Sequence, residues 1–188
     1  PVDVNDRMVR AKLGLAVDTP EETEAMKWGL RLEPVIAIAY AEETGREVIA
    51  PAPHTLYRAS TPFLIATPDR FVDKDARGPG GVEIKTAGIF RADEWAEEPP
   101  LHYQIQAHHQ MAVMGWGWCS LVVLIGGQRL VWADLERNDR FIRILLEQET
   151  AFWERIEKAD PPPPEATDKA VLAALYPKDD GASVALPP

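Results

Sequence analysis

The chain has 188 residues, of which 46% are hydrophobic and 27% are charged, as expected for one globular domain with a sizeable core. The formal net charge of −10 argues against a protein that coats nucleic acid through a generally basic surface, although a local basic groove or bridging metal ions stay open. With a single cysteine, Cys119, and no apolar stretch near the about 20 residues that cross a bilayer, we expect no internal disulfide, no membrane span and a cytoplasmic location.

The first predicted element is a helix that begins near Thr19 and ends near Thr44. Thr19 is a typical N-cap, followed by a proline at the first helical position and a capping-box glutamate, and Gly45 is a typical stop. Pro34 lacks the N–H that an interior helical residue donates, so we expect a kink or break there. At helical spacing, Glu33 is an acid in a row of otherwise apolar or aromatic residues: Met26, Leu30, Ala37 and Tyr40.

Strand signals follow this helix. His54–Ala59 is a weak signal and Phe63–Val72 a stronger one. Within the second, Pro68 indicates a bulge or an edge position, because proline cannot donate to a strand ladder. Residues 73–81 have the composition of a turn and lead into a strand over Gly81–Ala87.

The remaining elements lie in the second half of the chain. Two prolines precede a predicted helix over Leu101–Met114. Trp118–Ile125 is continuously apolar, as in a central strand buried on both faces, and two glycines then turn the chain into a strand over Arg129–Leu135. A long helix is expected over about Asn138–Lys158.

This order of elements predicts a mixed α/β or α+β domain built around one sheet. We expect the domain to occupy residues 1–160. Residues 161–188 begin with the stiff spacer Pro161–Pro164 and continue as a tail with one short helical candidate, Lys169–Leu175.

Two charges on the Gly81–Ala87 strand point to chemistry. Glu83 and Lys85 share one face, because side chains alternate in a strand, and unpaired charges on a half-buried sheet are costly. If the two strands that flank residues 73–81 form a hairpin, Asp69 faces Glu83. Two converging carboxylates suit Mg²⁺ or Mn²⁺ far better than zinc, and the ammonium group of Lys85 beside them would stabilise charge on a phosphate.

These residues resemble a known signature. Pro68-Asp69 followed by Glu83-Ile84-Lys85 is similar to the PD-(D/E)xK motif of nucleases. Four blocks narrow the resemblance: Leu32-Glu33-Pro34, Ala66-Thr67-Pro68-Asp69, Glu83-Ile84-Lys85-Thr86 and Tyr103-Gln104-Ile105-Gln106. In this order, between Trp28 and Gly127, they resemble the YqaJ family of phage-type recombination exonucleases, related to the exonuclease of phage lambda. The resemblance implies a restriction-endonuclease-like core, in which helices flank a central mixed β-sheet.

The resemblance also implies roles for individual residues. The implied metal ligands are Asp69, Glu83, the main-chain carbonyl of Ile84 and, from the first helix, Glu33. Lys85 matches the catalytic lysine. Gln104 matches a glutamine that orients the water or holds the lysine, with Gln106 as the less favoured alternative. The basic residues near these motifs are the expected phosphate contacts: Arg70, Lys74, Arg77 and Arg91.

The function that the resemblance implies is that of a Mg²⁺-dependent deoxyribonuclease, with Mn²⁺ able to substitute. It would digest one strand of double-stranded DNA 5′→3′ and leave 3′ single-stranded tails for a phage annealing protein, as a ring-like homotrimer in the bacterial cytoplasm. No clear match to the family's upstream phosphate-binding segment is present and the chain starts with Pro1, so we expect upstream residues to be missing. Two alternatives stay open: another PD-(D/E)xK nuclease, such as an endonuclease or a helicase-associated enzyme, and a non-catalytic DNA-binding or assembly module of the same fold.

Purely structural interpretations also exist for these residues. Glu83 and Lys85 can pair with each other on a solvated face, Glu33 can be an exposed acid with a basic partner, and Gln104 can be a surface residue. No two histidines among His102, His108 and His109 have the i, i+4 spacing of a helical zinc site, so structural or solvent-facing roles are favoured for them. Core positions are favoured over base stacking for the tryptophans Trp116, Trp118, Trp132 and Trp153.

Overall fold

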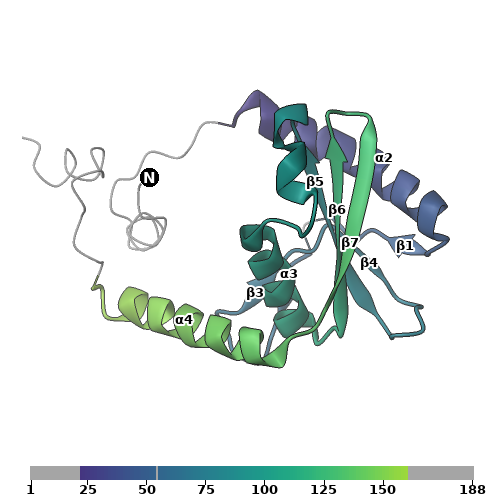
Figure 1. The fold of residues 1–188 in the computed structure, drawn as a ribbon. Coiled ribbons are helices and arrows are strands. Elements are labelled where there is room, and N and C mark those ends of the chain that lie inside the picture. Colours follow the sequence, from purple (N-terminus) through teal and green to yellow (C-terminus); the bar gives the residue numbers. More distant parts are fainter. Residues whose placement is uncertain (1–21, 54, 161–188) are drawn as a thin grey trace, which may run out of the picture. The chain divides into compact units, whose positions relative to one another are not determined.

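The computed structural model describes residues 22–53 and 55–160 (Figure 1). The chain divides into two units, one of Glu22–Glu147 and one that joins Pro1–Glu21 to Gln148–Pro188. Of the second unit only residues 148–160 are described, so the expected spacer and tail over residues 161–188 lie outside the described residues. None of the described helices has the length and apolar character of a membrane span.

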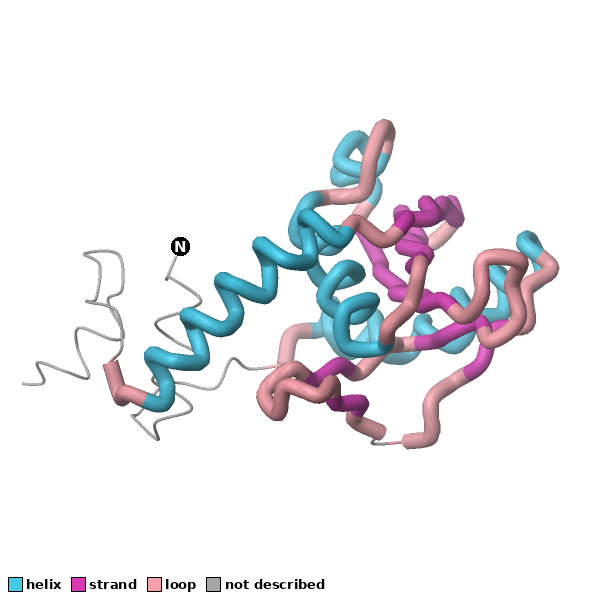
Figure 2. Tube along the Cα trace, turned by 90° about the horizontal axis from the view of Figure 1, so that it is seen from below, coloured by secondary structure: helices cyan, strands magenta, loops and turns pink. Residues whose placement is uncertain are grey.

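The unit Glu22–Glu147 is built on a five-stranded mixed sheet, which confirms the predicted fold class. The strand order is β1-β4-β5-β6-β7, and the pair β5–β6 is parallel while the other pairs are antiparallel. The strands are β1 (Val48–Ile49), β4 (Arg70–Val72), β5 (Gly80–Ala87), β6 (Trp118–Ile125) and β7 (Arg129–Glu136). A separate two-stranded sheet pairs β2 (Tyr57–Arg58) with β3 (Ile65–Ala66) (Figure 2).

Helices cover the two faces of the five-stranded sheet (Figure 1). Helix α2 (Glu24–Thr44) buries Ile36, Ala37 and Tyr40 against one face, where they meet side chains of β4, β5 and β6. Helix α3 (Leu101–Met114) buries Ala107 and Met111 against the other face. Ile142, near the start of α4 (Asp139–Glu157), joins this second core. Alternate residues of β5 therefore belong to different cores, which places Glu83 on the α3 face.

Two glycines at the start of β5 allow large rings to lie flat against the sheet. A Cβ atom on Gly80 would overlap the ring of Trp118, and a Cβ on Gly81 would lie 2.7 Å from the ring of Trp116. Trp118 is fully buried and Trp116 is 5% exposed, as expected from the sequence. The pair Gly80-Gly81 thus fits one tryptophan on each face of the strand.

Helix α2 starts later than the sequence pattern indicates. Thr23 caps it, accepting a hydrogen bond from the Met26 N–H at 3.2 Å, while the predicted start at Thr19 lies outside the described residues. Gly45 ends it in the left-handed conformation, with φ at 68°, as predicted. The expected break at Pro34 does not occur, and the helix runs on to Thr44, because the residues beyond the proline pack into the core.

The single strand expected over Phe63–Val72 was a wrong prediction. The segment forms two short strands, β3 and β4, which belong to different sheets, and the chain passes between them through Thr67, the buried Pro68 and Asp69. β1 was not predicted. The 3₁₀ helix η1 (Ile89–Trp95) was not predicted either. The bounds of α3 and β6 match the predictions, while β7 differs by one residue at its end and α4 by one residue at each end.

Candidate active site

Asp69 is positioned by the end of the β4–β5 ladder. The two strands form the predicted antiparallel hairpin, with Arg70 opposite Val82, so the preceding residue, Asp69, comes opposite Glu83. Its Oδ2 accepts a hydrogen bond of 2.8 Å from the main-chain N–H of Ile84. The carboxylate is thereby held against β5, with Asp69 opposite Glu83 as the sequence predicted.

Glu83 is almost completely buried, with 1% of its surface exposed, and its carboxylate accepts hydrogen bonds from three side chains. Its Oε1 lies 2.5 Å from Nζ of Lys85 and 2.6 Å from Nε2 of Gln106. Its Oε2 lies 2.6 Å from Nε2 of Gln110. Glu83 and Lys85 do pair with each other, but on a buried face of the sheet rather than on a solvated one. A buried carboxylate is tolerated because these donors replace water.

Glu33 reaches the site from the opposite face of the sheet. Its Oε1 forms an ion pair of 2.5 Å with Nη1 of Arg70, which also donates to the main-chain oxygen of Asp69 at 2.5 Å. The side chains of Glu33 and Arg70 are 22% and 14% exposed, respectively, so this pair is largely shielded from water. The basic partner of Glu33 is therefore Arg70, which connects the acid of α2 to the backbone at Asp69.

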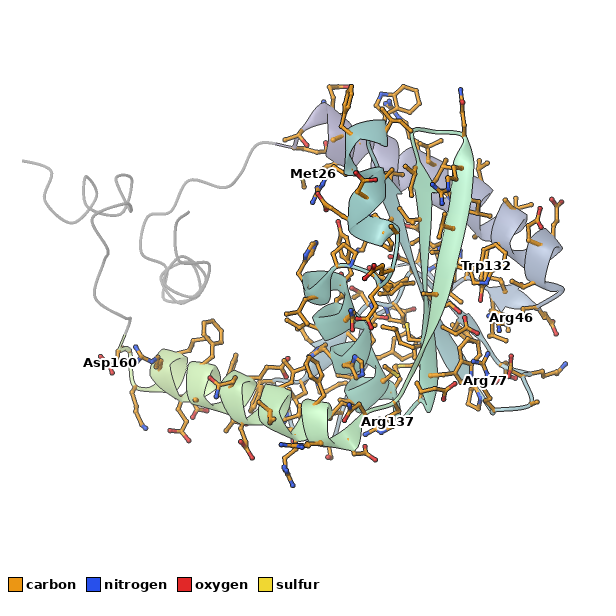
Figure 3. The ribbon with its side chains drawn as sticks, viewed as in Figure 1. Met26, Arg46, Arg77, Trp132, Arg137 and Asp160 are labelled. Carbon is orange, nitrogen blue, oxygen red and sulfur yellow. The ribbon has the colours of Figure 1, made fainter. Side chains whose placement is uncertain are left out.

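Glu33, Asp69 and Lys85 line one cleft of about 460 Å³. Its polar lining comes from Glu22, Glu33, Asp69, Lys85 and Thr86, while the first turns of α2 supply mainly small or apolar residues. One of these, Met26, is labelled in Figure 3 near the start of α2. Glu83 does not line the cleft but lies buried beside it, bonded to Lys85. Nζ of Lys85 also lies 5.0 Å from the ring centroid of Tyr103, at cation–π distance.

The electrostatics of this cleft favour a bound cation. The pKa of Asp69 is raised to about 7, mainly by burial and also by the nearby charge of Glu83, while the hydrogen bond from Ile84 lowers it. Carboxylate and carbonyl oxygens are the ligands that hard divalent ions prefer. Within residues 22–53 and 55–160, however, no group of three or more His, Cys, Asp or Glu side chains is gathered closely enough to hold a metal. The site residues fit a divalent ion in chemistry and charge, and Arg70 and Lys85 hold contacts for which such an ion would compete.

The glutamines of α3 do not take the places that the sequence favoured. The side-chain amide of Gln104 donates to the main-chain oxygen of Pro99 at 2.7 Å, away from Glu83. Gln106, the less favoured residue, bonds Glu83 instead. Gln110 was missed altogether. Its signal was the i, i+4 spacing from Gln106, which places both amides on the helix face that packs on β5.

The four basic residues expected at the site lie in different environments, and each is paired with an acid. Only Arg70, among these four, contacts site residues. Lys74 lies 3.6 Å from Glu47, and Arg91 lies 2.7 Å from Glu94. Arg77 appears far from Met26 in Figure 3, so it does not flank the cleft that Met26 lines.

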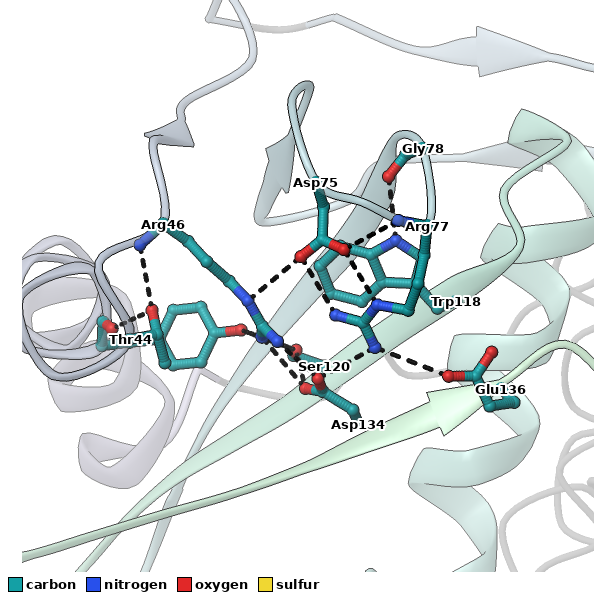
Figure 4. Close-up of polar contacts among 10 residues, drawn as sticks. Thr44, Arg46, Asp75, Arg77, Gly78, Trp118, Ser120, Asp134 and Glu136 are labelled. Atoms are coloured by element: carbon teal, nitrogen blue, oxygen red, sulfur yellow. Dashed lines mark hydrogen bonds and ion pairs between the residues drawn. The ribbon is translucent and has the colours of Figure 1, made fainter.

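Arg77 belongs instead to a second polar cluster (Figure 4). Its guanidinium lies 3.9 Å from the ring centroid of Trp118 and 2.9 Å from Asp75, and it also pairs with Asp134 at 3.0 Å. The hydrogen bonds from Arg77 lower the pKa of Asp75 to about 2. Arg46 joins the cluster through an ion pair of 2.6 Å with Asp134. These contacts attach the β4–β5 turn to β6 and β7, which is a structural role.

Neither His102 nor His108 lines the cleft. His108 is buried, its Nδ1 lies 2.8 Å from the main-chain oxygen of Gln104, and its ring packs 4.8 Å from that of Phe141. The ring of His102 packs against Tyr103, with 3.9 Å between the centroids. Both environments agree with the structural roles favoured from the sequence.

Comparison with known protein families and sequences places this geometry in context. The family described as "YqaJ-like viral recombinase domain" matches residues 2–116. The protein YqaJ of Bacillus subtilis (strain 168) is 29% identical over 180 residues, which are 93% of this chain and 50% of that protein. The chain thus spans about half the length of this relative.

Solved structures share the fold. An alkaline exonuclease from Laribacter hongkongensis, LHK-Exo, has a TM-score of 0.62 at 23% identity, with 83% of this chain and 79% of that chain covered. LHK-Exo in complex with dAMP gives 0.65 at 24% identity with the same coverage. A phage related exonuclease from Haemophilus somnus 129PT gives 0.64 at 12% identity, over 82% of this chain and 80% of that chain.

Proposed function

The chain belongs to the family of YqaJ-like viral recombinase domains, and from this membership we propose that it is a metal-dependent deoxyribonuclease of the phage exonuclease type. The observation that carries the proposal is the arrangement of Asp69, Glu33 and Lys85 around one cleft, with the carboxylate of Glu83 bonded to Lys85. We further propose digestion of one strand of duplex DNA 5′→3′, which leaves a 3′ single-stranded tail.

The names of the structural relatives support this class of substrate. Two of them are described as exonucleases, and one was solved with dAMP, a deoxynucleoside monophosphate. A product of this kind is what hydrolysis of DNA from an end releases. For the present chain, a homotrimeric ring around DNA and an annealing protein as partner belong to the proposal as well.

The proposed cofactor is Mg²⁺, with Mn²⁺ able to replace it. The residues that would hold it are Asp69, Glu83, the main-chain carbonyl of Ile84 and Glu33. A bound divalent ion would activate a water for attack on the phosphodiester and neutralise charge on the phosphate. The chain's own cation for the same purpose is Lys85, whose ammonium group would stabilise the negative charge that develops on the phosphoryl oxygens. Arg70, which pairs with Glu33 in the metal-free protein, would contact the phosphate backbone when the ion takes over Glu33.

Cleavage of an end-labelled linear duplex, with and without Mg²⁺, tests the proposal. We expect Mg²⁺-dependent release of nucleotides by the wild type and no cleavage by Lys85→Ala, with folding and metal binding largely intact in that variant. Lys158→Ala, which removes a lysine side chain that is 67% exposed, is the matched control and keeps full activity. Normal digestion by Lys85→Ala would refute the assignment.

A covalently closed circular duplex separates the alternatives. An end-dependent exonuclease leaves the circle intact, whereas an endonuclease of the same superfamily nicks or linearises it. A non-catalytic module binds DNA but cuts neither substrate at any Mg²⁺ concentration.

A further inference from the structure

The two oxygens of the Glu83 carboxylate have different surroundings. Oε1 is bonded by Lys85, which is 20% exposed and lines the cleft, and by Gln106 on the more exposed part of α3. Oε2 is bonded by Gln110, which is 3% exposed. One oxygen is therefore held from the cleft side by partners that can move, and the other is held from within the core.

Gln110 is an unusual residue for its position. It lies on α3 next to Met111, which is completely buried, and near the equally buried Ala107. Its amide nitrogen donates to Glu83, but its Oε1 is buried and accepts no hydrogen bond in the part of the chain that the structure describes. An unsatisfied buried acceptor costs about 1 to 3 kcal/mol. Methionine, with a similar length, would fill the space without that cost but would leave Oε2 of Glu83 without this donor, so the glutamine serves the carboxylate rather than the packing.

We propose that Gln110 is a positioning residue that fixes Glu83 through Oε2, so that Oε1 is the oxygen presented to a divalent ion. This rests on the proposed function. Lys85 and Gln106 hold Oε1 when no ion is bound and yield it when an ion binds, whereas Gln110 keeps its hydrogen bond in both states. Fixing the free rotation of the carboxylate in this way lowers the cost of ordering the site when the ion arrives.

The test is metal affinity in the substitution Gln110→Met, which removes the donor and keeps the side-chain length. Mn²⁺ binding is measured by titration calorimetry without DNA, and thermal unfolding is measured in EDTA. We expect Mn²⁺ to bind about 10- to 100-fold more weakly than to the wild type, the usual effect of losing a hydrogen bond to a ligating carboxylate. Unfolding in EDTA shifts only modestly, because the lost hydrogen bond to Glu83 is offset in part by the removal of the unsatisfied Gln110 oxygen. Nuclease activity, lost at low Mg²⁺, returns when the Mg²⁺ concentration is raised.

Gln128→Met is the control, because Gln128 lies exposed in the turn between β6 and β7, and its Mn²⁺ affinity stays at the wild-type value. If Gln110→Met does not fold, Gln110→Asn, which keeps an amide but draws it back by one methylene, replaces it with the same expected loss of affinity. A folded variant that binds Mn²⁺ within twofold of the wild type overturns this inference and leaves the proposed nuclease function standing. A wild-type protein that neither binds Mn²⁺ nor cleaves DNA overturns both.

Discussion

Replacing Asp69 by asparagine should change how the stability of the metal-free protein depends on pH. The pKa of Asp69 is raised from 3.8 to about 7, first by burial and then by the charge of Glu83. A carboxyl whose pKa is higher in the folded state favours folding while it is protonated, and this contribution is lost as the pH rises through the folded pKa. Each pKa unit corresponds to about 1.36 kcal/mol, so ionised Asp69 destabilises the fold by up to about 4 kcal/mol above pH 7. Between pH 5 and pH 8 the expected change is about 2 to 3 kcal/mol.

Asparagine resembles the protonated carboxyl, and its side-chain oxygen can still accept the hydrogen bond from Ile84. In EDTA, the free energy of unfolding of Asp69→Asn minus that of the wild type should therefore rise with pH by about 2 to 3 kcal/mol between pH 5 and pH 8. Urea unfolding at several pH values measures this difference. Asp73→Asn, which removes an exposed carboxylate in the β4–β5 turn, is the control and should give a nearly flat difference. A flat curve for Asp69→Asn as well would refute the raised pKa of Asp69, and with it the reason why the cleft favours a cation.

Two further substitutions test the packing around β5 and the competition for Glu33. Gly80→Ala should destabilise the protein by about 1 to 3 kcal/mol or more, because the added methyl overlaps the ring of Trp118. Gly88→Ala is the control, because a Cβ there has nothing within 4 Å, and its stability should stay within about 0.5 kcal/mol of the wild type. Thermal or urea unfolding measures both. Equal stabilities of the two variants would contradict the packing. Arg70→Met removes the cation that holds Glu33, so calorimetry should show tighter Mn²⁺ binding while filter binding shows weaker DNA affinity; weaker Mn²⁺ binding would show that Arg70 supports the metal site instead of competing for it.

The sequence predicts this fold best where the hydrophobic pattern of an element is long and where the element is buried on one face or completely. The bounds of β6 follow from a continuous apolar run that both cores cover. β1, β3 and β4 contain two or three residues each, which is too short for any periodicity, so their pairing depends on tertiary contacts that no local pattern records. The hairpin that brings Asp69 to Glu83 was predictable because the turn composition of residues 73–81 forces the strands together.

The choice between glutamines shows a different limit. The resemblance points to a segment with Gln104 and Gln106, but residues two apart on a helix point in nearly opposite directions, so only one of them can face β5. Which face packs on the sheet is set by the buried residues Ala107 and Met111, and these select Gln106 together with Gln110. A helical register drawn from the buried residues, rather than from the motif, would have found both amides.

The site depends on an interruption of the sheet. If β4 began two residues earlier and kept the same pairing with β5, Pro68 would lie opposite Ile84. The segment before β4 instead lies outside the five-stranded sheet and pairs with β2 as strand β3. The N–H of Ile84 therefore donates to the Asp69 side chain. The same departure opens the edge of β5, so that Glu33 of α2 can reach from one face and Glu83 can lie on the other, with Asp69 between them. Proline, which cannot donate to a ladder, is therefore the residue that turns a strand edge into a place where carboxylates from both faces of the sheet come near one another.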